Sequence, residues 1–262
     1  VKSNRLIEAS YRLGLNEQRI ILYAICRCRE EQTGLLPDLP VTITADAFAH
    51  QFPSIDKTNV YRQLKEAMDA LYDRSVTLYE TDEDTGKEQV SKTRWISKAS
   101  YVDGAGRIKI VFTPDVIKYI TRLEEEFTSY QLEKVGQMTS AYAVRIYELL
   151  AQHREIGNRT LNLKWLRETL QIAADEYKLT ADFIKRVLDV AVDQVNKHSD
   201  LTVSYKPVKT GRAITDFAFK IKDKERKPKS ASAPSDHAYR AKLEANGQQR
   251  IPDPVTDDQE EF

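Results

Sequence analysis

Apolar residues recur along the chain in two rhythms, one typical of helices and the other of strands. The first strong helical pattern runs from Asn16, which is suited to capping, to about Glu30. A short strand is expected at 41–43, followed by a helix that Thr44 caps. The next helix opens near Asp56 and places apolar residues on one face up to Leu71. Strands are then expected over 76–80, 93–102 and 107–112.

A similar order returns in the second half of the chain. Thr139 and Ser140 start a helix, 160–163 is strand-like, and 164–171 is a short helix. Thr180 is expected to cap a long helix whose apolar stripe runs from 183 to 195, and strands follow at 201–205 and 213–221. Equivalent elements are separated by 119 to 123 residues. This nearly constant offset predicts two copies of one structural unit.

The order within each copy is helix, strand, two helices and a β ribbon, which is typical of a winged helix. The predicted fold class is therefore α+β, with tandem winged-helix domains over 1–125 and 126–222. A generic α+β domain has the same periodicity and stays open as an alternative. Residues 223–262 are polar, and the last twelve contain five acids and no base. This segment is expected to be a linker and acidic disordered tail, with a weak helix near 239–245.

The composition, 41% hydrophobic and 31% charged, is typical of a soluble globular protein. The sequence contains neither an apolar run long enough for a membrane span nor a secretory signal, which predicts a cytoplasmic protein with no membrane partner. Because the first residue is Val rather than Met, a short N-terminal stretch is expected to precede it. Cys26 and Cys28 stand two apart in a helical pattern, so they are expected to be ordinary thiols.

The 40 basic and 40 acidic residues cancel, but their positions do not. Seven bases and nine acids fall in 223–262, which leaves 1–222 with a charge of +2. On the long helix of the second copy, Lys185 and Arg186 lie in the first two turns, and the acids Asp189 and Asp193 lie further along. A recognition helix enters the major groove by its N-terminal half, where such bases reach guanine. The pattern predicts contact with double-stranded DNA.

The first copy repeats this order of bases before acids, followed by a basic ribbon. A solvated helix face with paired charges would explain either helix alone, but the repetition favours DNA contact. The candidates in the second copy are Asp182, Lys185 and Arg186 on the helix and Lys206, Lys209 and Arg212 on the wing. Those in the first copy are Lys57, Asn59, Arg62 and Lys65 on the helix and Arg94 and Lys98 on the ribbon.

The sequence shows no recognisable motif for catalysis or metal binding. It contains no Gly-rich phosphate loop of the G-x-x-x-x-G-K-[ST] type, and Gly104–Gly106 is expected to be a hairpin turn. The four histidines are scattered without a metal-ligand spacing. We therefore predict a protein that is not an enzyme and has no catalytic residues, metal site or cofactor. The alternative of a nucleic-acid enzyme rests only on the tail and the tyrosines.

Three separated segments carry a family resemblance. They are Tyr142–Leu150, Asp182–Leu188, and Gly211-Arg212 leading to Phe219. Together they resemble the iteron-binding plasmid replication initiators of the RepE/RepA type, the tandem winged-helix Rep proteins. The resemblance extends from Ser3 to about Ile221.

This resemblance implies that the second winged helix reads the main part of a repeated origin sequence. It implies that Lys185 and Arg186 enter the major groove, that Arg212 contacts the backbone, and that the helix with Arg62 and Lys65 is a second reader within a dimerisation module. Family members typically start replication as monomers and repress their own promoter at an operator as dimers. Further implied partners are the host replication initiator, the replicative helicase and chaperones, in a bacterial cytoplasm. A winged-helix transcriptional repressor without a replication role remains the alternative.

Overall fold

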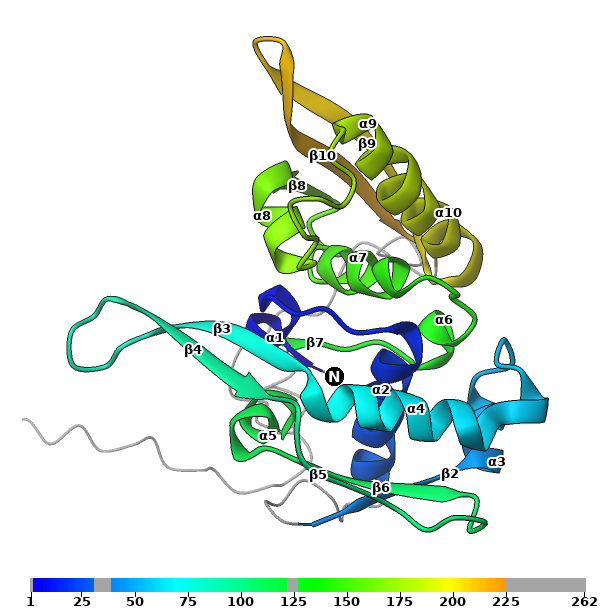
Figure 1. The fold of residues 1–262 in the computed structure, drawn as a ribbon. Coiled ribbons are helices and arrows are strands. Elements are labelled where there is room, and N and C mark those ends of the chain that lie inside the picture. Colours follow the sequence, from blue (N-terminus) through cyan, green and yellow to red (C-terminus); the bar gives the residue numbers. More distant parts are fainter. Residues whose placement is uncertain (1, 31–38, 122–126, 225–262) are drawn as a thin grey trace, which may run out of the picture. The chain divides into compact units, whose positions relative to one another are not determined.

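The computed structural model describes residues 2–30, 39–121 and 127–224 (Figure 1). Within these ranges the predicted order of helices and strands is present twice. The first copy consists of α2 (Leu15–Glu30), β2 (Val41–Thr44), α3 (Ala45–Gln51), a 3-10 turn (Lys57–Asn59), α4 (Val60–Asp73), β5 (Ile96–Tyr101) and β6 (Arg107–Phe112). The second consists of α7 (Ala141–Ala151), β8 (Asn158–Asn162), α8 (Leu163–Thr169), α9 (Thr180–Phe183), a π turn (Ile184–Leu188), α10 (Asp189–His198), β9 (Leu201–Thr210) and β10 (Ala213–Asp223).

The two copies share one sheet topology. In the first, β6 lies between β2 and β5, and in the second, β10 lies between β8 and β9. Every one of these pairings is antiparallel. The last two strands of each sheet form the wing that follows the helix-turn-helix. The shared topology confirms the prediction of two tandem winged helices.

A two-stranded ribbon is inserted between α4 and the wing of the first copy. β3 (Ser75–Thr81) pairs only with β4 (Glu88–Arg94) among the named strands, outside the three-stranded sheet. The prediction of one strand over 93–102 is therefore wrong, since the chain leaves the ribbon and enters the wing at Trp95. Trp95 and Ile96 are both fully buried, and two adjacent buried residues break the alternation of a single strand. In the second copy only Ser199 and Asp200 separate α10 from β9.

Helix caps follow the sequence in some places and depart from it in others. Thr44 caps α3 and Ser140 caps α7 through side-chain oxygens that accept backbone N–H bonds, as predicted. Asn16 lies inside the first turn of α2, where its Oδ1 accepts a bond of 3.1 Å from Arg19. Thr180 is the first residue of α9 rather than its cap. Both of these predicted caps are wrong, because α2 begins before Asn16 and α9 begins at Thr180 itself, after Leu179.

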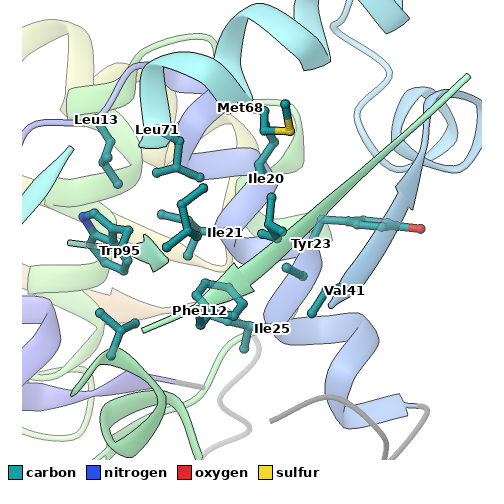
Figure 2. Packing of buried hydrophobic residues seen from close by; sticks show 14 of the residues in the cluster. Leu13, Ile20, Ile21, Tyr23, Ile25, Val41, Met68, Leu71, Trp95 and Phe112 are labelled. Atoms are coloured by element: carbon teal, nitrogen blue, oxygen red, sulfur yellow. The ribbon is translucent and has the colours of Figure 1, made fainter. Parts of the chain in front are cut away.

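The second long helix of each copy, α4 in the first and the helix over 180–198 in the second, is anchored by its own hydrophobic cluster. Figure 2 shows part of the first cluster, where Ile20 and Ile21 of α2 lie near Met68 and Leu71 of α4. The Trp95 ring packs edge-on against the Tyr11 ring, with the two ring centroids 4.9 Å apart. The second cluster joins α7, α8, the helix 180–198 and the wing strands. The predicted apolar stripe of α4 is confirmed, since all its members are buried: Val60, Leu64, Ala67, Met68 and Leu71.

The N-terminal segment is tied to the second copy by a buried ion cluster that the sequence did not predict. β1 (Lys2–Ser3) pairs with β7 (Phe127–Thr128) and continues into α1 (Asn4–Glu8). Lys2 Nζ lies 2.7 Å from Glu148 Oε1, and Arg145 Nη1 lies 3.4 Å from Glu148 Oε2. Burial alone would raise the pKa of Glu148, but Lys2 and Arg145 lower it below its usual value. The remaining helices are α5 (Pro114–Thr121) and α6 (Glu133–Gly136).

No helix in the described ranges is long and apolar enough to cross a bilayer. The predicted linker and acidic tail, with its weak helix near 239–245, lies outside the described residues from 225 onward. The predicted limits of the two winged-helix domains, 1–125 and 126–222, stay predictions.

Candidate nucleic-acid interface

The continuous helix over 180–198, formed by α9, the π turn and α10, is the recognition helix of the second copy. Its inner face completely buries Phe183, Val187 and Ala191. Lys185 and Arg186 are exposed on the other side, and Asp182 is half-buried in the first turn. Because the apolar stripe fixes the orientation of the helix, both bases stand on the face that is free to meet a ligand.

The π turn gives this helix an unusual repeat. The Asp189 N–H bonds to the carbonyl of Ile184, five residues earlier instead of four. Exposure then repeats every four residues, with 185–186 exposed, 187–188 buried and 189–190 exposed. The spacing of the apolar residues is equally compatible with an α-helix, so the sequence did not reveal this turn.

Polar bonds fix the recognition helix to the wing. The Tyr205 hydroxyl on β9 donates to Asp189 Oδ1 at 2.6 Å. Burial and then the nearby carboxylate of Asp189 raise the pKa of Tyr205. Asn196 exchanges two bonds with the backbone of Val203, of 2.9 and 2.6 Å. Gln194 Oε1 fixes the same helix to the start of α7, because it accepts N–H bonds from the two residues that precede α7, at 2.8 and 3.0 Å. Helix and wing therefore present their bases as one preorganised unit.

The wing of the second copy carries Lys206, Lys209 and Arg212, all exposed. Gly211 has a φ of +62°, which lets the tip turn tightly. The strands lie beside α10, and the tip extends past the start of α9 (Figure 1). Within the described part of the chain, no ion pair engages the three wing bases or the two on the helix. These five cations are available to an external polyanion.

The first copy places two of its predicted bases near the start of α4. Lys57 is exposed. The Arg62 side chain is 68% exposed, and its Nε lies 3.9 Å from Glu66, which makes a weak surface pair. Asn59 donates to Asp56 at 3.2 Å and so helps to close the 3-10 turn. Arg62 is thus the more accessible of the two arginines predicted to contact DNA in this copy.

The side chain of Lys65, on α4, lies against the wing of its own copy. Its Nζ is 3.0 Å from Asp103 Oδ1 and 3.8 Å from the centroid of the Tyr101 ring. Hydrogen bonding to Asp103 raises the pKa of Lys65. The Tyr61 hydroxyl also bonds to the carbonyl of Val102, at 2.9 Å. These contacts tie the wing tip to α4, so a contact between Lys65 and DNA would have to compete with them.

The basic ribbon predicted for the first copy is divided between two elements. Lys98 lies exposed on the wing strand β5, whereas Arg94 ends β4 of the inserted ribbon. Arg94 donates to the carbonyl of Tyr72 at 2.8 Å and lies 3.3 Å from Asp73, at the far end of α4 from Arg62. The prediction of one basic ribbon is therefore wrong, because the chain changes sheets between these two residues. Their role as DNA contacts stays a prediction.

Other chemistry in the described residues is limited. No group of three or more His, Cys, Asp or Glu side chains in these ranges could hold a metal ion. Cys28 is buried, and burial raises the pKa of the Cys26 thiol, which donates to Glu30 at 3.3 Å. A cavity of about 680 Å³ lies beside the inserted ribbon and is lined mainly by polar side chains, including Glu80 and Asp82. The acids at this end of the ribbon would repel a polyanion.

Two family models match the chain, in the order of the two copies. The model described as "Initiator Replication protein, WH1" matches residues 1–151. The model described as "Initiator Rep protein, WH2" matches residues 162–221.

Individual relatives were also found. An uncharacterized 27.6 kDa protein of Escherichia coli is 24% identical over 232 residues, which cover 86% of this chain and 94% of that protein. The Pi initiator protein, solved in complex with iteron DNA, has a TM-score of 0.69 and 21% identity, covering 86% of this chain and 97% of its own. The WH1 domain of MSBI1.176, a replication protein isolated from a multiple sclerosis patient, is 36% identical with a TM-score of 0.37, covering 45% of this chain and 88% of its own. Because the two models match successive parts of the chain and the first alone spans more than half of it, this protein belongs to the initiator replication protein family.

Proposed function

We propose that this protein initiates plasmid replication by binding direct repeats, called iterons, in the plasmid origin. The observation that carries the proposal is the match of both initiator models to a chain whose second winged helix presents five accessible bases. Bases at the start of a recognition helix suit guanine in the major groove, and bases on a wing suit phosphate. The Pi initiator, which shares the fold, was solved with iteron DNA.

The contacts divide between base reading and backbone binding. Lys185 and Arg186 read bases, whereas Lys206, Lys209 and Arg212 hold the backbone. The start of α4 and the turn before it form the second reader, with Lys57, Asn59 and Arg62. Lys65 and Arg94 add to this reader after they leave their present contacts, and Lys98 adds to it from the wing. In the second copy, Asp182 adds a hydrogen-bond acceptor beside Lys185. Two readers in successive major grooves, about 10 bp apart, would protect about 20 bp of DNA.

The protein acts without catalysis or a cofactor in this proposal. Several copies bound to adjacent repeats would bend the DNA and help to open a neighbouring A·T-rich segment, because binding energy can offset the cost of bending and unstacking. The family resemblance supports a dimer, in equilibrium with the monomer, that represses the protein's own promoter. It also supports contacts with the host replication initiator, the replicative helicase and chaperones.

A complementation experiment tests replication directly. The gene is supplied in trans to a plasmid that carries the adjacent direct repeats and no other origin. We expect the wild-type chain to maintain the plasmid and Arg186→Ala to lose it. Lys222→Ala is the matched control, since it removes an exposed base at the end of β10 opposite the wing tip and should retain replication. Repression of the promoter without plasmid maintenance by the wild-type chain would instead establish the alternative, a repressor with no replication role.

A further inference from the structure

One large apolar side chain is exposed on the recognition helix of the second copy. Val190 is 39% exposed and follows Arg186 by one turn. Single exposed apolar residues are common on protein surfaces, so its position is what matters. The neighbouring Asp189 carboxylate accepts a bond from Tyr205 and is thereby held toward the wing.

The π turn aligns Val190 with Arg186. An α-helix has about 3.6 residues per turn, so residues four apart are normally rotated from each other around the axis. The wider turn at 184–188 reduces that rotation, which is why both residues are exposed in the four-residue repeat. Four residues rise about 6 Å along a helix, and stacked base pairs are about 3.4 Å apart. Val190 and Arg186 can therefore reach positions about two base pairs apart.

The chemistry of Val190 selects one kind of base. Its side chain has no hydrogen-bonding group, so it cannot read the donors and acceptors of guanine, adenine or cytosine. Thymine is the DNA base that presents a methyl group, at C5, in the major groove, and apolar side chains contact that group.

We propose that Val190 contacts the C5-methyl group of a thymine about two base pairs from the guanine that Arg186 reads. This inference rests on the proposed function and adds a second base to those that the recognition helix selects. Burial of one methyl group against an aliphatic side chain corresponds to about three- to fivefold in affinity.

The test uses DNA sites that the full wild-type chain selects from a pool of random duplexes. Each thymine of the selected site is replaced singly by deoxyuridine, which removes only the C5-methyl group, and the dissociation constant is measured. We expect one position at which deoxyuridine weakens binding by about three- to fivefold. Replacement of each guanine by 7-deazaguanine then locates the base that Arg186 reads, as the position at which Arg186→Ala no longer discriminates.

The decisive comparison is a double-mutant cycle that combines Val190→Ala in the protein with replacement of thymine by deoxyuridine in the DNA. Val190→Ala should weaken binding to the thymine site by the same factor and bind thymine and deoxyuridine equally at that position. Ile156→Ala is the matched control, since Ile156 is 64% exposed on a turn outside the interface and should keep the full thymine preference. If Val190→Ala keeps the wild-type preference at every thymine, or if no thymine shows a preference, the inference is wrong. If the wild-type chain selects no DNA site at all, the proposed function fails first.

Discussion

The buried carboxylate of Glu148 should be one of the most sensitive positions in the protein. Its side chain is 0% exposed and lies 2.7 Å from Lys2 and 3.4 Å from Arg145, whose side chains are 5% and 3% exposed. It also accepts a bond from the Tyr130 hydroxyl. Glu148→Gln keeps the shape of the side chain but leaves two buried cations without their shared anion. Breaking a buried pair in this way costs about 3–5 kcal/mol of unfolding free energy.

Thermal unfolding followed by circular dichroism measures this loss. For a folded region of this size, about 3–5 kcal/mol corresponds to a Tm lowered by about 6–20 °C at pH 7. The matched control is Glu66→Gln, which breaks the pair with Arg62 at 3.9 Å, where the two side chains are 67% and 68% exposed. That exposed pair should contribute less than about 1 kcal/mol. A Tm for Glu148→Gln no lower than that of Glu66→Gln would refute the assignment of a buried ion cluster.

The loss of stability in Glu148→Gln should depend on pH. Lys2 and Arg145 hold the pKa of Glu148 below its usual value near 4.5, against the effect of burial. A carboxylate of this kind stabilises the fold above its unfolded-state pKa and loses that contribution as the pH falls through the lower folded-state pKa. The stability difference between wild type and Glu148→Gln should therefore be complete at pH 7 and narrow below about pH 4.

Three further predictions concern the DNA interface. Arg186→Ala should cost about 1–3 kcal/mol of binding free energy on the selected site and relax specificity at one position. Arg212→Ala should weaken binding to all sequences alike and reduce the salt slope, the dependence of log affinity on log salt concentration, by about one. Equal losses of affinity for specific and random DNA in Arg186→Ala would contradict its role. Arg62→Ala should also reduce the salt slope by about one. Lys65→Ala should reduce it by less and should speed hydrogen exchange at 101–103, because the ammonium of Lys65 holds the wing tip through Asp103 and must leave it to reach DNA. Unchanged hydrogen exchange in Lys65→Ala would contradict its role in holding the wing tip. Tyr205→Phe removes the hydrogen bond to Asp189 between wing and helix, so it should weaken specific DNA binding, measured by calorimetric titration, with little change in Tm. A lowered Tm with unchanged DNA affinity would show that Tyr205 has a purely structural role.

Local sequence patterns predicted much of the fold. The stripe on α4 and the caps Thr44 and Ser140 depend on neighbours within a few residues, so periodicity and capping chemistry reveal them. The constant offset between the two halves predicted two copies of one structural unit, and the shared sheet topology confirms them. Lys185 and Arg186 were placed correctly on the exposed face, since the opposite face is continuously apolar.

The missed features depend on contacts between distant segments. The pairing of Lys2 with Glu148 joins residues 146 positions apart, and no local pattern announces it. The change of sheet at Trp95 had a weak signal, two adjacent apolar residues inside a predicted strand, that could have divided the strand. Lys65 looked like a free base because the sequence does not show that the wing returns to it with Asp103.

The central claim, that both winged helices read one repeated DNA site, is tested most directly by a hydroxyl-radical footprint of the full chain on a single repeat beside a scrambled control. We expect protection of about 20 bp centred on two successive major grooves, with much weaker binding to the scrambled duplex at physiological salt. Protection of under about 12 bp within one groove, or equal affinity for the scrambled DNA, would contradict the account.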